Sequence, residues 1–116
     1  MIIELFFDVE TQKLFSDIPN DDPGLLGVSV VSLYRRELDA QLHEQTGEMK
    51  SFWHPDAHLT PIIDELWEWF LRADRIIGFN SKKFDVPALT PYFNGDLGTL
   101  PHFDLLEIIR NIIGRL

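Results

Sequence analysis

The sequence lacks cysteine, a long apolar run and an N-terminal leader. Without cysteine among its 116 residues, the chain has no disulfides or thiolate metal sites, and nothing indicates an oxidising compartment. No stretch approaches the roughly 20 apolar residues that cross a bilayer, and the first residues carry no basic signal-peptide leader. No phosphate-binding loop and no serine or cysteine nucleophile motif is present. We therefore expect a single soluble, cytoplasmic domain over residues 1–116, without a membrane partner.

Positive charge is also scarce, because the formal net charge is −9. Proteins that hold nucleic acid by its phosphate backbone usually carry basic patches, since Lys and Arg release condensed counterions. Here the basic residues occur in small groups, namely Arg35-Arg36, Arg72 with Arg75, Lys82-Lys83, and Arg110 with Arg115. This pattern excludes a free-standing, high-affinity DNA binder. It fits a site that works through bound cations, or a fragment whose basic parts lie elsewhere.

Hydrophobic periodicity predicts a mixed α/β fold. Residues 2–9 are almost wholly apolar and show no helical period, which predicts a central strand buried on both faces. Apolar residues recur at helical spacing over residues 61–73, and Pro91 limits a second, short or kinked helix over residues 85–93. Further strands are predicted over residues 27–34, 48–53, 75–79 and 100–103. Three antiparallel strands therefore precede an alternation of strand and helix.

Two acidic residues interrupt the apolar first strand. Asp8 and Glu10 are two residues apart, so in a strand they point to the same face with Cα atoms roughly 6.5 Å apart. Carboxylates buried there without partners would be costly. Either the strand ends and the carboxylates are solvated, or they bind a hard cation, because Mg²⁺ and Mn²⁺ prefer carboxylate oxygens. An isolated Asp-x-Glu does not decide between these alternatives.

A second segment of interest is Gly78-Phe79-Asn80-Ser81-Lys82-Lys83-Phe84-Asp85, which follows a predicted buried strand. The glycine permits a tight exit, and Asn80 tolerates a turn. Asp85 suits a helix N-cap, which is the structural alternative to a metal-binding role. Lys82 and Lys83 are candidates for contact with a phosphate, although a solvated loop explains them equally well.

Together, the two segments resemble the first two motifs of the DEDD 3′–5′ exonucleases, which belong to the ribonuclease H-like superfamily. Phe7-Asp8-Val9-Glu10-Thr11 matches the first motif, hydrophobic-Asp-x-Glu-Thr. Gly78-Phe79-Asn80 leading to Phe84-Asp85 matches the second, in the form found in exonuclease domains of family B DNA polymerases and their stand-alone relatives. The order, the strand context and a spacing of about 75 residues agree. The resemblance extends from residue 2 to about residue 113.

The resemblance implies a ribonuclease H-like mixed sheet and a metal-dependent exonuclease that acts on a single-stranded nucleic-acid 3′ end. It implies that Asp8, Glu10 and Asp85 are catalytic and bind one or two Mg²⁺ or Mn²⁺ ions. One cation would activate the attacking water, and the other would stabilise the leaving 3′ oxygen. The residues implied to bind or position the substrate are Thr11, Asn80, Lys82 and Lys83.

The sequence departs from the family at the third motif, which places a Tyr or His a few residues before a fourth acidic ligand. That motif normally follows a further helical segment, beyond the position equivalent to Gly114. Asp104 is not a substitute, because with Glu107 three residues later it resembles a capping box that opens a final helix. We therefore expect a C-terminally incomplete exonuclease domain, truncated before its last motif, in which three carboxylates hold a cation weakly.

Two other functions stay open. One is a catalytically inactive ribonuclease H-like module that binds nucleic acid or protein, and the other is a phosphoesterase that acts on small nucleotides and needs no basic groove. Trp67 and Trp69 are candidates for stacking on bases. Their place on an amphipathic helix favours packing instead, against the sheet or against a partner protein or missing C-terminal segment that covers this region.

Overall fold

The computed structural model describes residues 1–53 and 60–114, without the side chains of residues 60 and 61. Within these residues a single mixed sheet has the strand order β3-β2-β1-β4-β5. Its strands are β1 (Ile2–Thr11), β2 (Val28–Leu38), β3 (Glu44–Trp53), β4 (Arg75–Gly78) and β5 (His102–Asp104). β1 pairs antiparallel with β2, and β2 with β3, whereas β4 runs parallel to both β1 and β5. The predicted mixed sheet is confirmed.

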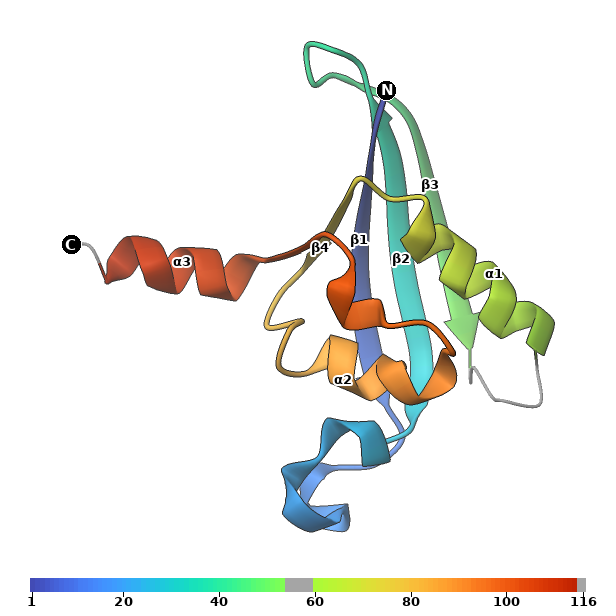
Figure 1. The fold of residues 1–116 in the computed structure, drawn as a ribbon, viewed down its shortest axis with the longest axis vertical. Helices are drawn as coiled ribbons and strands as arrows, with labels where there is room; N and C mark the ends of the chain where they lie inside the picture. Colours follow the sequence, from blue (N-terminus) through green and yellow to red (C-terminus); the bar gives the residue numbers. More distant parts are fainter. Residues whose placement is uncertain (54–59, 115–116) are drawn as a thin grey trace.

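The α-helices are α1 (Thr60–Leu71), α2 (Asp85–Leu89) and α3 (Leu105–Ile113). α1 and α2 lie over the same face of the sheet, whereas α3 projects away from the body of the molecule (Figure 1). α2 is short, as predicted, and continues as a 3₁₀ turn over Thr90–Tyr92 that holds Pro91. No helix in the described part of the chain is long and apolar enough to cross a membrane.

The core lies between the sheet and helices α1 and α2. Alternate β1 residues Leu5, Phe7 and Val9 are buried there, and the Phe7 ring meets the Phe70 ring edge-on at 5.3 Å between centroids. Fully burying side chains of this kind contributes about 1.5–3 kcal/mol each. The other β1 face differs, so the prediction that β1 is buried on both faces is wrong. Asp8 and Glu10 are exposed on that other face.

Helix α3 forms where predicted, but its apolar side is exposed. Asp104 caps it, because Oδ1 of Asp104 accepts a hydrogen bond from Leu106 N–H at 3.1 Å. The predicted capping box is only half right, since Glu107 pairs with Lys82 at 3.1 Å instead of returning to the cap. The exposed aliphatic residues of α3, each between 40% and 61% exposed, are Leu105, Ile108, Ile109, Ile112 and Ile113.

The two tryptophans of α1 pack within this chain. Trp67 is partly buried against Phe93, at 4.9 Å between ring centroids. Trp69 is partly buried against Phe52 of β3, at 6.4 Å between ring centroids. Trp69 therefore packs against the sheet, as one of the predictions had it, whereas Trp67 packs against the segment after α2.

Candidate active site at the end of strand β1

The site begins where β4 parts from β1. The two strands pair only from Glu4 to Phe6 of β1, and β1 then continues to Thr11. Beyond Phe6 this edge of β1 therefore has no neighbouring strand to accept its N–H groups. The tight loop that follows β4 requires Gly78, because a Cβ there would lie 2.6 Å from Cβ of Ser81. The predicted tight exit at this glycine is confirmed.

Asp85 occupies the edge that β4 leaves. The loop turns through Asn80, whose φ of 55° lies in the left-handed region that asparagine tolerates, and it delivers Asp85 beside β1. Phe84 holds the N-cap position of α2, so the N-cap interpretation of Asp85 is wrong. Oδ2 of Asp85 instead accepts a hydrogen bond from Val9 N–H at 3.3 Å, and the residue is only 4% exposed.

Asp8 and Glu10 flank Val9 on β1 and point to the face opposite the core. Both are exposed, whereas Val9 is buried. The register places Ser32 opposite Asp8 and Val30 opposite Glu10, so neither carboxylate has a cationic cross-strand neighbour on β2. The predicted placement of both acids on one face of one strand is confirmed.

The surroundings of Asp85 disfavour its ionised form. Burial is the main cause that raises its pKa from 3.8 to about 7, followed by the charge of Asp8. The hydrogen bond from Val9 lowers the pKa, and the charge of Asp104 raises it further. Among the described residues, no ion pair involves Asp8, Glu10 or Asp85. A nearby cation would favour the charged form of Asp85.

The donor set fits a hard divalent cation, because carboxylate oxygens are the ligands that Mg²⁺ and Mn²⁺ prefer. The fit is incomplete in one respect. Within residues 1–53 and 60–114, no three acidic or histidine side chains gather closely enough to hold a metal ion as they stand. Mutual repulsion between Asp8 and Asp85 opposes such a cluster when no cation compensates it.

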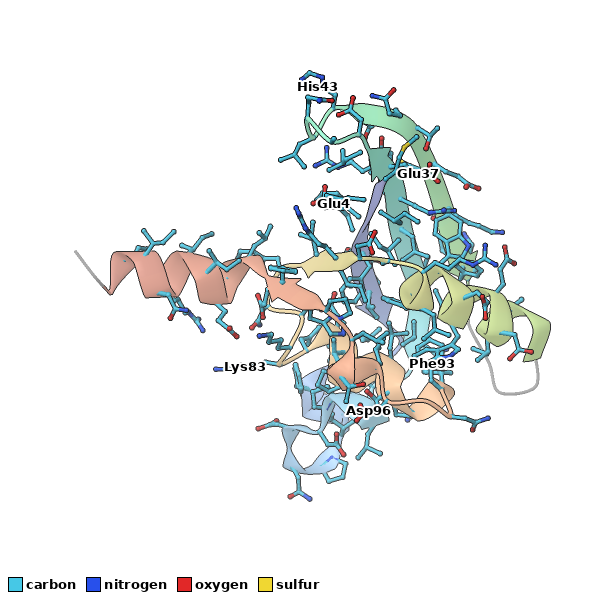
Figure 2. All side chains as sticks on the ribbon, turned by 45° about the horizontal axis from the view of Figure 1, so that its top comes forward. Glu4, Glu37, His43, Lys83, Phe93 and Asp96 are labelled. Atoms are coloured by element: carbon cyan, nitrogen blue, oxygen red, sulfur yellow. The ribbon has the colours of Figure 1, made fainter. Side chains whose placement is uncertain are left out.

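The residues expected to position substrate are spread over two places. The Thr11 hydroxyl lies at the end of β1 and donates to the Lys13 carbonyl at 3.1 Å. Asn80 and Lys82 turn towards β5 instead, where their N–H groups donate to the Asp104 carboxylate at 2.8 and 3.2 Å. Lys83 points outward from the loop (Figure 2).

Asp104 is 5% exposed and is satisfied by three backbone N–H groups, those of Asn80, Lys82 and Leu106. Its carboxylate therefore fixes the loop after β4 to the start of α3. This agrees with the expectation that Asp104 caps a helix. Arg110 and Asn111 of α3 share a hollow with the loop and were not predicted. The polar side of an amphipathic helix signals such residues, but only the fold shows that this side faces the loop.

Comparison with known proteins identifies the superfamily of the chain. The sequence model of the RNase H superfamily matches residues 5–114, from β1 through α3. The chain belongs to the RNase H superfamily. No curated protein matches it.

Solved structures share the RNase H-like fold at low identity. Escherichia coli exonuclease I in complex with a dA16 oligonucleotide superposes with a TM-score of 0.66 at 18% identity, over 97% of this chain. The family B DNA polymerase of Pyrobaculum calidifontis superposes with a TM-score of 0.58 at 20% identity, over 94% of this chain. The chain spans 30% of the length of that exonuclease and 16% of that polymerase. This likeness establishes the fold.

Proposed function

We propose that this RNase H superfamily chain is a metal-dependent exonuclease unit that hydrolyses phosphodiester bonds at single-stranded nucleic-acid 3′ ends. The observation that carries the proposal is a buried carboxyl group, Asp85, held against β1 beside the charge of Asp8. A buried acid with a strongly raised pKa, close to a second acid at one end of a sheet, is more typical of a functional site than of a structural one. Escherichia coli exonuclease I, which shares this fold, was solved in complex with ssDNA.

Asp8, Glu10 and Asp85 are the residues that would hold the cation or cations. When bound, divalent ions supply an activated water and stabilise the leaving 3′ oxygen. Of the three acids, Asp85 has the most defined position, because Val9 N–H orients its carboxylate. The exposure of Asp8 and Glu10 leaves their side of β1 open to a substrate.

Thr11 and Asn80 are the positioning groups in this proposal, and Lys82 and Lys83 bind the strand. The loop from Asn80 to Asp85 carries both lysines and ends at Asp85, so positive charge lies within a few residues of the acidic end of β1. An anionic strand that reaches the acids from that side therefore meets positive charge first.

One observation favours a second candidate, a non-catalytic module that binds nucleic acid or protein. The described residues hold no cluster of three potential metal ligands, and Asp104, the next buried acid along the chain, is occupied by three backbone N–H groups. Such a module would bind an oligonucleotide without shortening it.

Hydrolysis of defined oligonucleotides separates the two candidates. The protein is incubated with a 5′-labelled single strand in Mg²⁺ or Mn²⁺, beside Asp85→Asn, Asp8→Ala and the exposed control Glu48→Gln. The proposal predicts stepwise shortening from the 3′ end, no shortening of a strand with a blocked 3′ end, and a loss of about 100-fold or more in the two site variants. Binding without shortening supports the module. Equal shortening by wild type and Asp85→Asn overturns the exonuclease assignment.

A further inference from the structure

The hollow between the loop after β4 and helix α3 has the chemistry of an anion site. Loop residues Asn80, Lys82 and Lys83 line one side, and Arg110 and Asn111 line the other, around a volume of about 250 Å³. Figure 2 shows Lys83 projecting from the loop on the side of the molecule where α3 lies. Three cationic side chains therefore meet in one concavity of a protein whose net charge is −9.

The two acids that also line the hollow are already occupied. Asp104 accepts three backbone hydrogen bonds, and Glu107 pairs with Lys82 at 3.1 Å. Among the described residues, no ion pair involves Lys83 or Arg110. The three cations of the hollow thus outnumber its two carboxylates, and two of the cations, Lys83 and Arg110, are in no ion pair with any residue that the structure describes.

The helix presents its polar side to this hollow. Glu107, Arg110 and Asn111 follow the i, i+3, i+4 spacing of one helical face and all line the hollow. The aliphatic stripe that begins with Leu105 and Ile108 lies on the other side of α3 and is exposed. A partner that covered this stripe would therefore leave the cationic hollow open.

We propose that this hollow binds a backbone phosphate of the nucleic-acid strand whose 3′ end reaches Asp8, Glu10 and Asp85. The proposal rests on the exonuclease function proposed above and adds a substrate subsite to it. Lys83 and Arg110 supply the positive charge. Arg110 can hold two phosphate oxygens at once through its planar guanidinium group, and the Asn80 and Asn111 amides supply neutral donors. Lys82 is paired with Glu107, so it adds less net charge to the contact with the strand than Lys83 does.

Charge-removal variants test the subsite. Lys83→Gln, Arg110→Gln and the double variant are compared with Arg72→Gln, an exposed control just beyond the end of α1 whose side chain pairs with Glu68. Binding of a 5′-fluorescein single strand with phosphorothioate linkages at its 3′ end, which slow hydrolysis, is followed by anisotropy in Mg²⁺ over a series of salt concentrations. Thermal melting confirms that each variant is folded.

The double variant is expected to bind about tenfold more weakly. Its salt dependence should fall by about 0.7 in log–log slope, the value for one phosphate contact on a single strand. The control should match wild type. Equal affinity and slope in wild type and the double variant would overturn the subsite and leave the exonuclease proposal standing.

Three further outcomes bear on the two proposals. Weaker binding by the double variant, with no shortening of an unmodified strand by wild type, supports the subsite and overturns the exonuclease function alone. Displacement of the strand by inorganic phosphate at an equal concentration of phosphate groups would identify a site for free anions and overturn the strand assignment. No binding by wild type would overturn both.

Discussion

Strand β1 has a buried carboxyl group near each end: Glu4 belongs to the strand and lies near its amino end, and Asp85 lies beside its carboxyl end. Their exposed fractions are nearly equal, at 5% and 4%. Arg36 contacts the Glu4 carboxylate at 2.6 Å, and Arg75 contacts it at 3.3 Å. Asp85 has one hydrogen bond, from Val9, and faces the like charge of Asp8. The charge of Glu4 is therefore neutralised by two arginines, whereas the charge of Asp85 is not compensated by any described residue.

Strand register explains the difference. Glu4 lies opposite Arg36 of β2 and opposite Arg75 of β4, so two neighbouring strands each supply a cation. At the other end β4 has parted from β1, and Asp8 lies opposite Ser32. The sheet supplies two arginines to Glu4, whose charge stabilises the fold. Asp85 is buried without a cation among the described residues, and a buried acid of this kind is a candidate for a functional role.

Removal of the Glu4 carboxylate gives the largest expected effect on stability. Glu4→Gln leaves Arg36 and Arg75 without their shared anion, and we expect the free energy of unfolding to fall by about 3 kcal/mol. Urea denaturation measures it. Glu37→Gln, which removes an acid from the more exposed pair with Arg35, should cost less than about 1 kcal/mol. A comparable loss of unfolding free energy in Glu4→Gln and Glu37→Gln would contradict the idea that the two arginines make Glu4 a stabilising charge.

Removal of the Asp85 charge should act in the opposite direction when no metal is present. The pKa of Asp85 is about 7 in the folded protein against 3.8 for the free group, so the folded state binds more protons between these values. The group's contribution to stability is therefore full below about pH 4 and is lost as pH rises to about 7. Asp85→Asn keeps an acceptor for Val9 N–H and removes this loss.

We expect Asp85→Asn and wild type to be similar near pH 4, and the variant to be more stable at pH 8 by about 2 kcal/mol. Denaturation in EDTA across this pH range measures the difference, in which the other titrating groups cancel. Parallel stability profiles for the two proteins would show that Asp85 is not strained by its surroundings.

The smallest effect is expected for Asn80→Gly, because at this position the backbone conformation matters more than the side chain. Because φ is 55°, Asn80→Gly should change the free energy of unfolding by no more than about 0.5 kcal/mol, whereas Asn80→Val should cost about 1–3 kcal/mol. Thermal melting of the two variants measures the difference. Equal costs would mean that the loop reaches β1 without this backbone conformation.

Local patterns predict most of the fold because they depend on near neighbours in sequence. The apolar run of β1, the helical period of α1 and the cap at Asp104 all lie where the sequence indicates. The β1 prediction fails on one face because burial depends on which elements cover each side of the sheet. The exposure of the apolar side of α3 could not be predicted either. Periodicity shows which residues share one face of the helix, but it does not show whether another element covers that face.

The sequence predicts which residues form the candidate site but not how they are arranged. The two-residue spacing of Asp8 and Glu10 predicts that they share one face of a strand, and the motif that ends at Asp85 marks this residue as a candidate. That Asp85 approaches Val9 rather than capping α2 depends on β4 ending at Gly78 while β1 continues. The two arginines around Glu4 likewise follow from register, which no single segment of sequence specifies.

Divalent-metal binding tests the central claim, that the carboxyl end of β1 holds a cation, most directly. Melting temperature is measured in EDTA and with Mn²⁺ or Mg²⁺ at pH 6 and pH 8, for wild type, Asp85→Asn and the exposed control Glu48→Gln. A metal at 100 times its dissociation constant stabilises by about 2.7 kcal/mol, which raises the melting temperature of a domain of this size by roughly 10 °C. The account predicts such a rise for wild type and the control, larger at pH 8 because binding must displace the Asp85 proton, and little or none for Asp85→Asn. An equal rise in all three proteins, or no rise in wild type, would contradict it.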